Sequence, residues 1–157
     1  MDKAKDVTHA RLSDQLCFSL YAASKAVTAA YRPLLADLGL TYPQYLVMLS
    51  LWERGSQTVA ELGGRVQLDS GTLSPLLKHL EAAQYVVRRR SPADERSVIV
   101  ELTAAGAALE LAAVPVREAV EAATGLTTEQ FKALRAALQN LTEHITQPEP
   151  AGSLPTP

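Results

Sequence analysis

Apolar residues recur every three or four positions over most of the first half of this chain, the spacing typical of amphipathic helices. The pattern predicts a long first helix over about residues 9–37, ended or kinked by Pro33. A second helix is expected from the capping pattern Thr41-Tyr42-Pro43-Gln44 to about Arg54, because proline is favoured in a first helical turn. The apolar positions expected to face inward on that second helix are Leu46, Leu49 and Trp52.

The middle of the chain predicts two shorter helices and a hairpin. Thr58-Val59-Ala60-Glu61 is a second capping pattern and starts a helix to about Val66. After a turn, a further helix is expected from about Ser70 to Ala83. Two β-branched runs, at 85–87 and 98–100, flank a Ser-Pro-Ala-Asp turn and predict a hairpin with a basic tip. The apolar stripe of the further helix is formed by Leu73, Leu76, Leu77 and Leu80.

The last third returns to helical periodicity. Thr103 is expected to cap a helix over about 104–123, kinked at Pro115, and Thr127 to cap another to about Ile145. The final eleven residues hold four prolines and no periodic apolar face, which predicts a disordered tail. The fold class is therefore mostly α with a small β-hairpin. The expected parts are an N-terminal helix (1–40), a central domain (41–102), C-terminal helices (103–146) and the tail (147–157).

Composition places the chain in the soluble globular class. It has 157 residues, 47% of them hydrophobic, and no apolar run approaches the ~18 residues of a membrane span. The charged N-terminus precedes no signal-peptide core, and a lone cysteine suits a reducing compartment, so a cytoplasmic location without membrane attachment is expected. The net charge of −2 is unevenly spread, because residues 54–96 hold seven basic and five acidic side chains. Basic charge is concentrated where the hairpin is expected.

Two short helices followed by a basic hairpin predict a winged helix-turn-helix that reads double-stranded DNA. A recognition helix needs small polar side chains near its N-terminus so that it fits the major groove, ~12 Å wide. A cation at a wing tip suits a narrow, AT-rich minor groove. The alternative is an ordinary packed helix beside solvated arginines. The candidate DNA-binding residues are Ser70, Thr72, Ser74, Pro75, Lys78 and His79 on the helix, and Arg88, Arg90 and Arg96 on the hairpin.

These segments resemble the MarR family of dimeric winged-helix regulators. The resemblance rests on Leu68-Asp69-Ser70-Gly71-Thr72-Leu73-Ser74-Pro75-Leu76-Leu77-Lys78, on Asp94-Glu95-Arg96 and on Leu102-Thr103-x-x-Gly106, within a match from about Leu12 to Ile145. It implies binding of a double-stranded operator by a homodimer whose terminal helices interlock. The Asp94-x-Arg96 wing signature adds Asp94 to the candidate DNA-binding residues.

The single cysteine, Cys17, lies on the first predicted helix. A cysteine on a leucine-rich helix is most often a buried small hydrophobe. Tyr21 follows four residues later on the same face, whereas Tyr31 is fourteen residues on, ~21 Å along a straight helix at about 1.5 Å per residue. Tyr31 therefore cannot reach Cys17 of its own chain if that helix is continuous. It can reach the cysteine of an antiparallel partner.

A narrower resemblance concerns the same residues. Leu16-Cys17-Phe18-x-Leu20-Tyr21-Ala22-x-Ser24, with further tyrosines at 31 and 42, resembles the OhrR branch of organic-hydroperoxide-sensing repressors. The resemblance implies that Cys17 is the peroxide-reactive thiol, that Tyr31 and Tyr42 of the partner chain hold its thiolate, and that Tyr21 is an additional contact. No second cysteine is present, so this is the one-cysteine type. Oxidised Cys17 then stops at sulfenic acid, cyclises to a sulfenamide, pairs with a low-molecular-weight thiol or over-oxidises.

Three functions remain to be separated. The leading interpretation is a repressor that leaves its operator when an organic hydroperoxide oxidises Cys17. The second is a repressor of the same family released by a non-covalent small aromatic ligand, with Cys17 incidental. An enzyme, namely a thiol peroxidase, is disfavoured because no peroxidase motif or second cysteine is present. No cofactor is expected, nor a metal, since His9, His79 and His144 form no ligand cluster.

Overall fold

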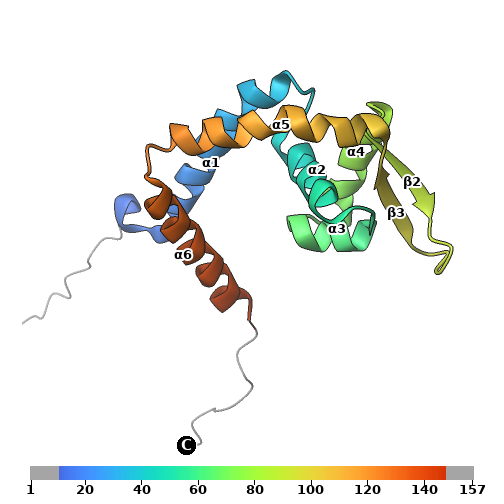
Figure 1. The fold of residues 1–157 in the computed structure, drawn as a ribbon. Helices are drawn as coiled ribbons and strands as arrows, with labels where there is room; N and C mark the ends of the chain where they lie inside the picture. The colour runs from blue at the N-terminus through green and yellow to red at the C-terminus, as the bar shows by residue number, and fades with distance from the viewer. Residues whose placement is uncertain (1–10, 148–157) are drawn as a thin grey trace, which may run out of the picture. The chain divides into compact units, whose positions relative to one another are not determined.

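The computed structural model describes residues 11–147, which form mostly helices and one small sheet (Figure 1). The chain divides into two compact units, one up to Val120 and one from Glu121 onward, and each is described by itself. In the first unit and across the boundary, the elements are η1 (Leu12–Asp14), α1 (Leu16–Ala36), α2 (Tyr42–Arg54), β1 (Gln57–Thr58), α3 (Val59–Val66), α4 (Ser70–Ala82), β2 (Val86–Arg90), β3 (Val98–Leu102) and α5 (Ala104–Ala123). The second unit holds α6 (Thr128–Thr146).

The N-terminal helix begins later than its sequence pattern predicts. A single 3-10 turn, η1, is followed by Gln15 in an extended conformation, so α1 starts at Leu16. Cys17 consequently lies in the first turn of α1 rather than further inside a longer helix. The helix ends at Ala36, close to the predicted limit near residue 37, so Pro33 does not end it, which was one of the two effects expected of this proline. Pro33 is exposed, so water can solvate the carbonyl that loses its usual donor.

The second helix begins as predicted but buries a different face. The amide oxygen of Gln44 accepts a hydrogen bond of 2.8 Å from the backbone N–H of Thr41, which closes the N-terminus of α2. Leu49, expected to face inward, is 39% exposed, and Leu46 and Trp52 are half-buried. The buried face carries polar and apolar side chains together, which obscures its period in the sequence. Its members are Gln44, Tyr45, Val47, Met48, Ser50 and Leu51.

The hairpin is part of a three-stranded antiparallel sheet in the order β1-β3-β2. β2 pairs with β3 from Val86 opposite Leu102 to Arg90 opposite Val98, and this long hairpin is the wing. β1 pairs with β3 through Gln57 opposite Val100 and was not predicted, because two residues are too few to show alternation.

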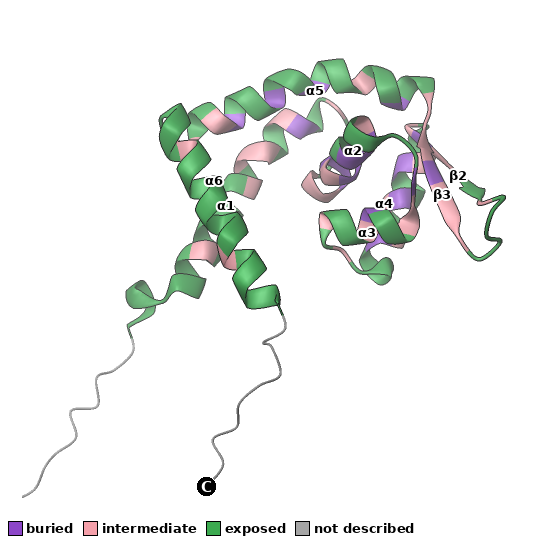
Figure 2. Cartoon of the chain, turned by 60° about the horizontal axis from the view of Figure 1, so that its bottom comes forward, coloured by how far each residue is buried: buried purple, intermediate pink, exposed green. Residues whose placement is uncertain are grey.

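The core lies between α2, α3, α4 and the sheet (Figure 2). Leu73, Leu77 and Leu80 are at most 1% exposed, which confirms the predicted inner face of α4, while Leu76 is half-buried. Leu62 of α3 and Val100 of β3 are fully buried against the same cluster. The recognition helix is thus fixed along one face and leaves the other to solvent.

The Leu102-Thr103-x-x-Gly106 motif makes a tight junction between β3 and α5. The backbone N–H of Thr103 donates to the Tyr85 carbonyl at 3.0 Å, and the Thr103 hydroxyl accepts from the Gly106 N–H at 3.0 Å. A Cβ on residue 106 would lie 1.9 Å from the Tyr85 carbonyl oxygen, so only glycine fits. Trp52 Nε1 donates to the Gly106 carbonyl at 2.9 Å and attaches α2 to this junction.

The C-terminal helices follow their predicted limits closely. α5 ends at Ala123 and contains Pro115 without interruption. Thr127 caps α6, because its hydroxyl accepts from Gln130 N–H and the Gln130 amide oxygen accepts from Thr127 N–H. No α6 residue is buried within the single chain, as the green and pink helix in Figure 2 shows. The predicted disordered tail lies outside the described residues from position 148 onward.

Candidate nucleic-acid interface and thiol site

The N-terminus of α4 presents small polar side chains on an exposed face. Asp69 is the N-cap: its Oδ1 accepts from Thr72 N–H at 2.9 Å and its Oδ2 from the Thr72 hydroxyl at 3.0 Å. These hydrogen bonds hold the pKa of Asp69 below its ordinary value. The predicted DNA-binding residues of this helix lie opposite the buried leucines. Ser70, Thr72, Pro75, Lys78 and His79 are exposed and Ser74 is half-buried.

A groove of about 560 Å³ runs between α3, the start of α4 and the wing. It brings together Ser70 and Ser74 of α4 with Arg88 and Arg96 of the wing. Residues about twenty positions apart in the sequence therefore share one surface.

The wing tip is shaped by Asp94. Its Oδ1 accepts from the backbone N–H of Arg96 at 3.0 Å, and its Oδ2 accepts from the hydroxyl of Ser97 at 2.8 Å. Both bonds lower the pKa of Asp94. Asp94 thus fixes the turn that exposes Arg96, and Ser97 is a contributor that sequence reasoning missed. Arg90 is exposed at the end of β2.

Arg88 lies in the middle of β2 rather than at the wing tip where the sequence pattern placed it. Its Nη2 lies 2.6 Å and its Nε 3.0 Å from Oε2 of Glu81 at the end of α4, and its backbone N–H donates to Oε1. This pairing lowers the pKa of Glu81. The neighbouring Arg89 pairs with Glu101 at 3.6 Å. Arg88 therefore ties the wing to the recognition helix.

Cys17 is exposed in the first turn of α1, among apolar side chains that the single chain leaves open. Leu16 is 60%, Phe18 39% and Tyr21 60% exposed. Tyr21 lies one helical turn from Cys17, with Lys25 Nζ 5.2 Å from its ring centre. Exposed apolar patches of this kind mark sites where proteins bind a partner or a ligand.

Tyr31 and Tyr42 lie side by side where α1 and α2 meet. Their ring centres are 4.8 Å apart, and Tyr31 is also 5.7 Å from Tyr45. Tyr45, only 3% exposed, was missed from the sequence although it follows Tyr42 by one helical turn. Burial raises the pKa of Tyr42 and of Tyr45, and Arg117 partly offsets the rise at Tyr45.

Within one chain the structure keeps the thiol and the tyrosine pair apart. α1 is continuous from Leu16 to Ala36, so Tyr31 lies ~21 Å along the helix from Cys17. The four residues predicted for the redox site thus fall into two groups, Cys17 with Tyr21 and Tyr31 with Tyr42.

Two kinds of site are absent from residues 11–147. Within that range no three His, Cys, Asp or Glu side chains gather as a metal site would require. Over the same stretch, no helix has the length and apolar character needed to span a membrane.

A capped recognition helix preceded by a short helix and followed by a basic hairpin defines a winged helix-turn-helix protein (Figure 1). Residues 29–109 match the family model described as transcriptional regulator SarA/Rot. The organic hydroperoxide resistance transcriptional regulator of Bacillus subtilis is 45% identical over 139 residues, which cover 88% of this chain and 95% of that protein.

Solved structures agree with these matches. The crystal structure of overoxidized AbfR bound to DNA, a protein of Staphylococcus epidermidis, superposes with a TM-score of 0.70 at 37% identity, covering 86% of this chain and 95% of that one. A mutant of MarR from E. coli complexed with operator DNA gives a TM-score of 0.73 at 26% identity, covering 80% of this chain and 92% of that one. The chain belongs to the MarR family of winged-helix transcriptional regulators, in its organic-hydroperoxide-regulator (OhrR) branch.

Proposed function

We propose that this regulator is a repressor that binds a pseudo-palindromic operator as a homodimer and is released when an organic hydroperoxide oxidises Cys17. The observation that carries the proposal is the separation of Cys17 from the Tyr31–Tyr42 pair along one continuous helix. An antiparallel partner would bring each thiol to the other chain's tyrosines. The regulator of Bacillus subtilis that is 45% identical is named for organic hydroperoxide resistance, which supports the same inducer.

The proposed reaction needs an accessible sulfur, and Cys17 is exposed in the first turn of α1. Hydroxyl groups of the partner's Tyr31 and Tyr42 would donate hydrogen bonds to this sulfur. The apolar neighbours Leu16 and Phe18 favour peroxides with a hydrocarbon group over hydrogen peroxide.

The reaction is a two-electron oxidation of sulfur. The thiolate attacks the terminal oxygen of the hydroperoxide, the O–O bond breaks, and the leaving alkoxide takes a proton to become an alcohol. Cys17 becomes a sulfenic acid. A low-molecular-weight thiol can then attack this sulfur, releasing water and leaving a mixed disulfide. Either product loses the thiolate charge and adds atoms where the tyrosines bind, so the subunits shift and the spacing of the two recognition helices changes.

The test uses DNA selected by the reduced protein from a random pool. Gel shifts with the wild type and with Cys17→Ser are compared before and after cumene hydroperoxide, with hydrogen peroxide alongside. We expect release of the wild type at lower concentrations of cumene hydroperoxide than of hydrogen peroxide, and no release of Cys17→Ser. If Cys17→Ser is still released, the thiol is not the sensor, and a non-covalent ligand becomes the better explanation.

A further inference from the structure

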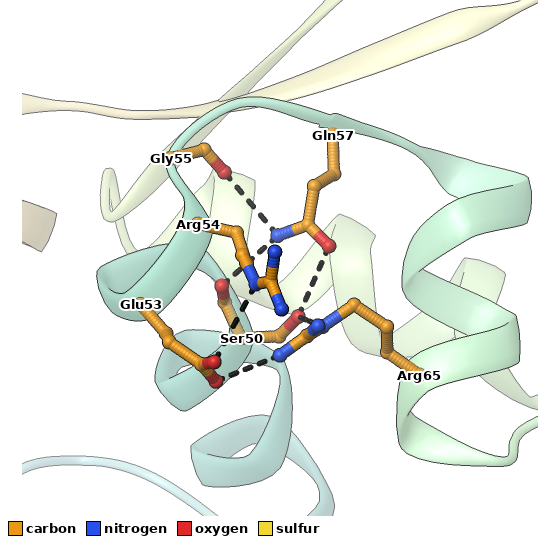
Figure 3. A network of polar contacts seen from close by, with 6 residues as sticks. All are labelled: Ser50, Glu53, Arg54, Gly55, Gln57 and Arg65. Carbon is orange, nitrogen blue, oxygen red and sulfur yellow. Dashed lines mark hydrogen bonds and ion pairs between the residues drawn. The ribbon is translucent and has the colours of Figure 1, made fainter.

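A cluster of polar side chains joins three segments next to the DNA-reading elements (Figure 3). Ser50 and Glu53 come from the end of α2, Gln57 from β1 and Arg65 from the last turn of α3. None of these four residues belongs to the candidate DNA-binding set. All lie within the first compact unit.

Gln57 is the buried centre of this cluster. The side chain is 7% exposed, and its amide nitrogen donates to the carbonyls of Ser50 at 2.9 Å and Gly55 at 3.3 Å. Its amide oxygen accepts from the Ser50 hydroxyl at 3.1 Å. The amide thus has a partner for each polar atom, which fixes β1 against the end of α2.

Arg65 connects α3 to the same place. Its Nε donates to the Ser50 hydroxyl at 2.9 Å, and its Nη2 lies 2.7 Å from Oε2 of Glu53. One planar guanidinium therefore spans a buried hydroxyl and a carboxylate on α2. Such a fork restricts the orientation of both helices more than a single contact does.

The recognition helix α4 and the wing are both connected directly to the segments that this cluster joins. α3 continues into α4 through Gln67, which adopts a left-handed conformation with φ 55°, and through a hydrogen bond from Leu68 N–H to the Gly63 carbonyl at 3.0 Å. β1 pairs with β3 of the wing, with Gln57 opposite Val100. A rotation of α3 or β1 against α2 would therefore displace the recognition helix or the wing.

We propose that Arg65 and Glu53 are positioning residues for DNA binding, which set the angle of the recognition helix and the wing relative to α2. Glu53 is negatively charged and would repel phosphate, so it has no attractive direct role on DNA. The proposal does not depend on how the protein is induced.

The decisive variant is Glu53→Gln, because charge and positioning predict opposite results. Removal of a negative charge from a DNA-binding domain should tighten binding on charge alone. Loss of the Arg65 anchor should weaken it, and we expect about fivefold weaker binding of selected operator DNA, measured by fluorescence anisotropy of the reduced protein. Arg65→Lys, which keeps the charge but cannot span Ser50 and Glu53 together, should show a smaller loss in the same direction.

Arg54→Gln is the matched control. Arg54 also pairs with Glu53, at 3.5 Å, but both residues belong to α2, so this pair does not connect two elements. Its effect should stay within about twofold. Thermal unfolding establishes that each variant is folded at the assay temperature, which is expected since Glu53 and Arg65 side chains are 61% and 34% exposed.

The dependence of affinity on salt completes the test. The logarithmic slope should be unchanged in Glu53→Gln and in Arg65→Gln, since neither residue contacts phosphate in this proposal. Combined in one protein, these two substitutions should weaken binding no more than Arg65→Gln does alone, because removal of Arg65 breaks its contact with Glu53 as well as its contact with Ser50. Binding by Glu53→Gln as tight as wild type, or a slope reduced by about one in Arg65→Gln, would overturn the proposal.

Discussion

Gly106 is the residue whose identity the backbone geometry restricts most severely. Gly106→Ala would place a methyl group 1.9 Å from the Tyr85 carbonyl oxygen, and backbone on both sides must move to relieve this overlap. We expect a loss of about 3 kcal/mol in the free energy of unfolding, measured by urea denaturation at fixed protein concentration.

Gly64 in α3 provides the comparison for Gly106. A Cβ at this position meets nothing within 4 Å, so Gly64→Ala should be neutral or stabilise by up to ~1 kcal/mol through the higher helix propensity of alanine. Equal losses in the two variants would show that the junction of β3 and α5 adjusts freely.

Arg96 is the residue expected to read the minor groove. Its side chain is exposed at a tip that Asp94 shapes, so Arg96→Ala should weaken DNA binding roughly tenfold and flatten any preference for AT pairs beside each half-site. Selection from random DNA, followed by anisotropy, measures both effects. Arg89→Ala, which removes a wing cation already paired with Glu101, should have the smaller effect. The opposite order would contradict the proposed orientation of the wing.

Four carboxylates that stabilise individual elements each have a pKa below the ordinary value. Asp69 caps α4, Glu61 caps α3, Asp94 shapes the wing tip, and Glu81 holds Arg88, and in each case hydrogen bonds favour the charged form. Since their folded pKa values lie below the unfolded ones, the unfolded chain binds more protons at acidic pH. Their stabilisation is present above about pH 4 and lost as pH falls through the folded pKa values.

Asp69→Asn isolates one of these contributions. Asparagine retains an acceptor for the Thr72 N–H but carries no charge, so the variant should be less stable than wild type at pH 7. The difference should shrink as pH falls below about 4, where Asp69 becomes protonated in the unfolded chain, and should be lost below the lower folded pKa of Asp69. Urea denaturation between these limits measures it. A difference that stays constant with pH would assign the effect to the shape of the side chain instead.

The elements that could be predicted from sequence are those whose signals are local. Thr58 with Glu61, and Thr127 with Gln130, mark helix starts through bonds made within four residues. The buried face of α2 and the two-residue strand β1 depend on tertiary packing, so their patterns are weak or absent in the sequence. The exposure of Pro33 to solvent allows α1 to continue past it, and exposure is not visible in a local sequence pattern.

In the candidate site, too, residues with local signals could be predicted and residues that depend on tertiary contacts could not. The polar face of α4 and the exposed Arg96 were predictable, because small residues opposite a leucine stripe define a surface. The pairing of Arg88 with Glu81 was not, since a run of arginines does not reveal which one meets an acid across the fold. Tyr45 and Gln57 were missed because a buried polar residue becomes meaningful only once its partners are known.

At the scale of the whole molecule, the C-terminal helices leave large apolar side chains exposed in the single chain. Leu111 of α5 is 81%, Leu134 of α6 50% and Ile145 of α6 75% exposed in the single chain. We expect an obligate homodimer, as the terminal helices bury little within one chain. Sedimentation should show a dimer at micromolar concentration, and the thermal midpoint should rise with protein concentration. A stable folded monomer under these conditions would contradict the proposal.

Leu134→Glu tests the same surface within α6. A charge at a half-exposed position should leave the single chain intact but prevent its association. Lys132→Glu, a charge reversal two residues away, serves as the comparison and should remain dimeric. Dissociation of both variants, or of neither, would show that the face of α6 carrying Leu134 does not form the dimer interface.

Trp52 gives the molecule a built-in optical probe. It is the only tryptophan in the chain, its indole N–H donates to the carbonyl of Gly106, and its ring lies 6.2 Å from that of Tyr45. Its emission therefore comes from one position, between the tyrosine cluster and the base of the wing. If the proposed mechanism holds, stopped-flow emission from unlabelled protein should follow the movement of the wing after peroxide is added.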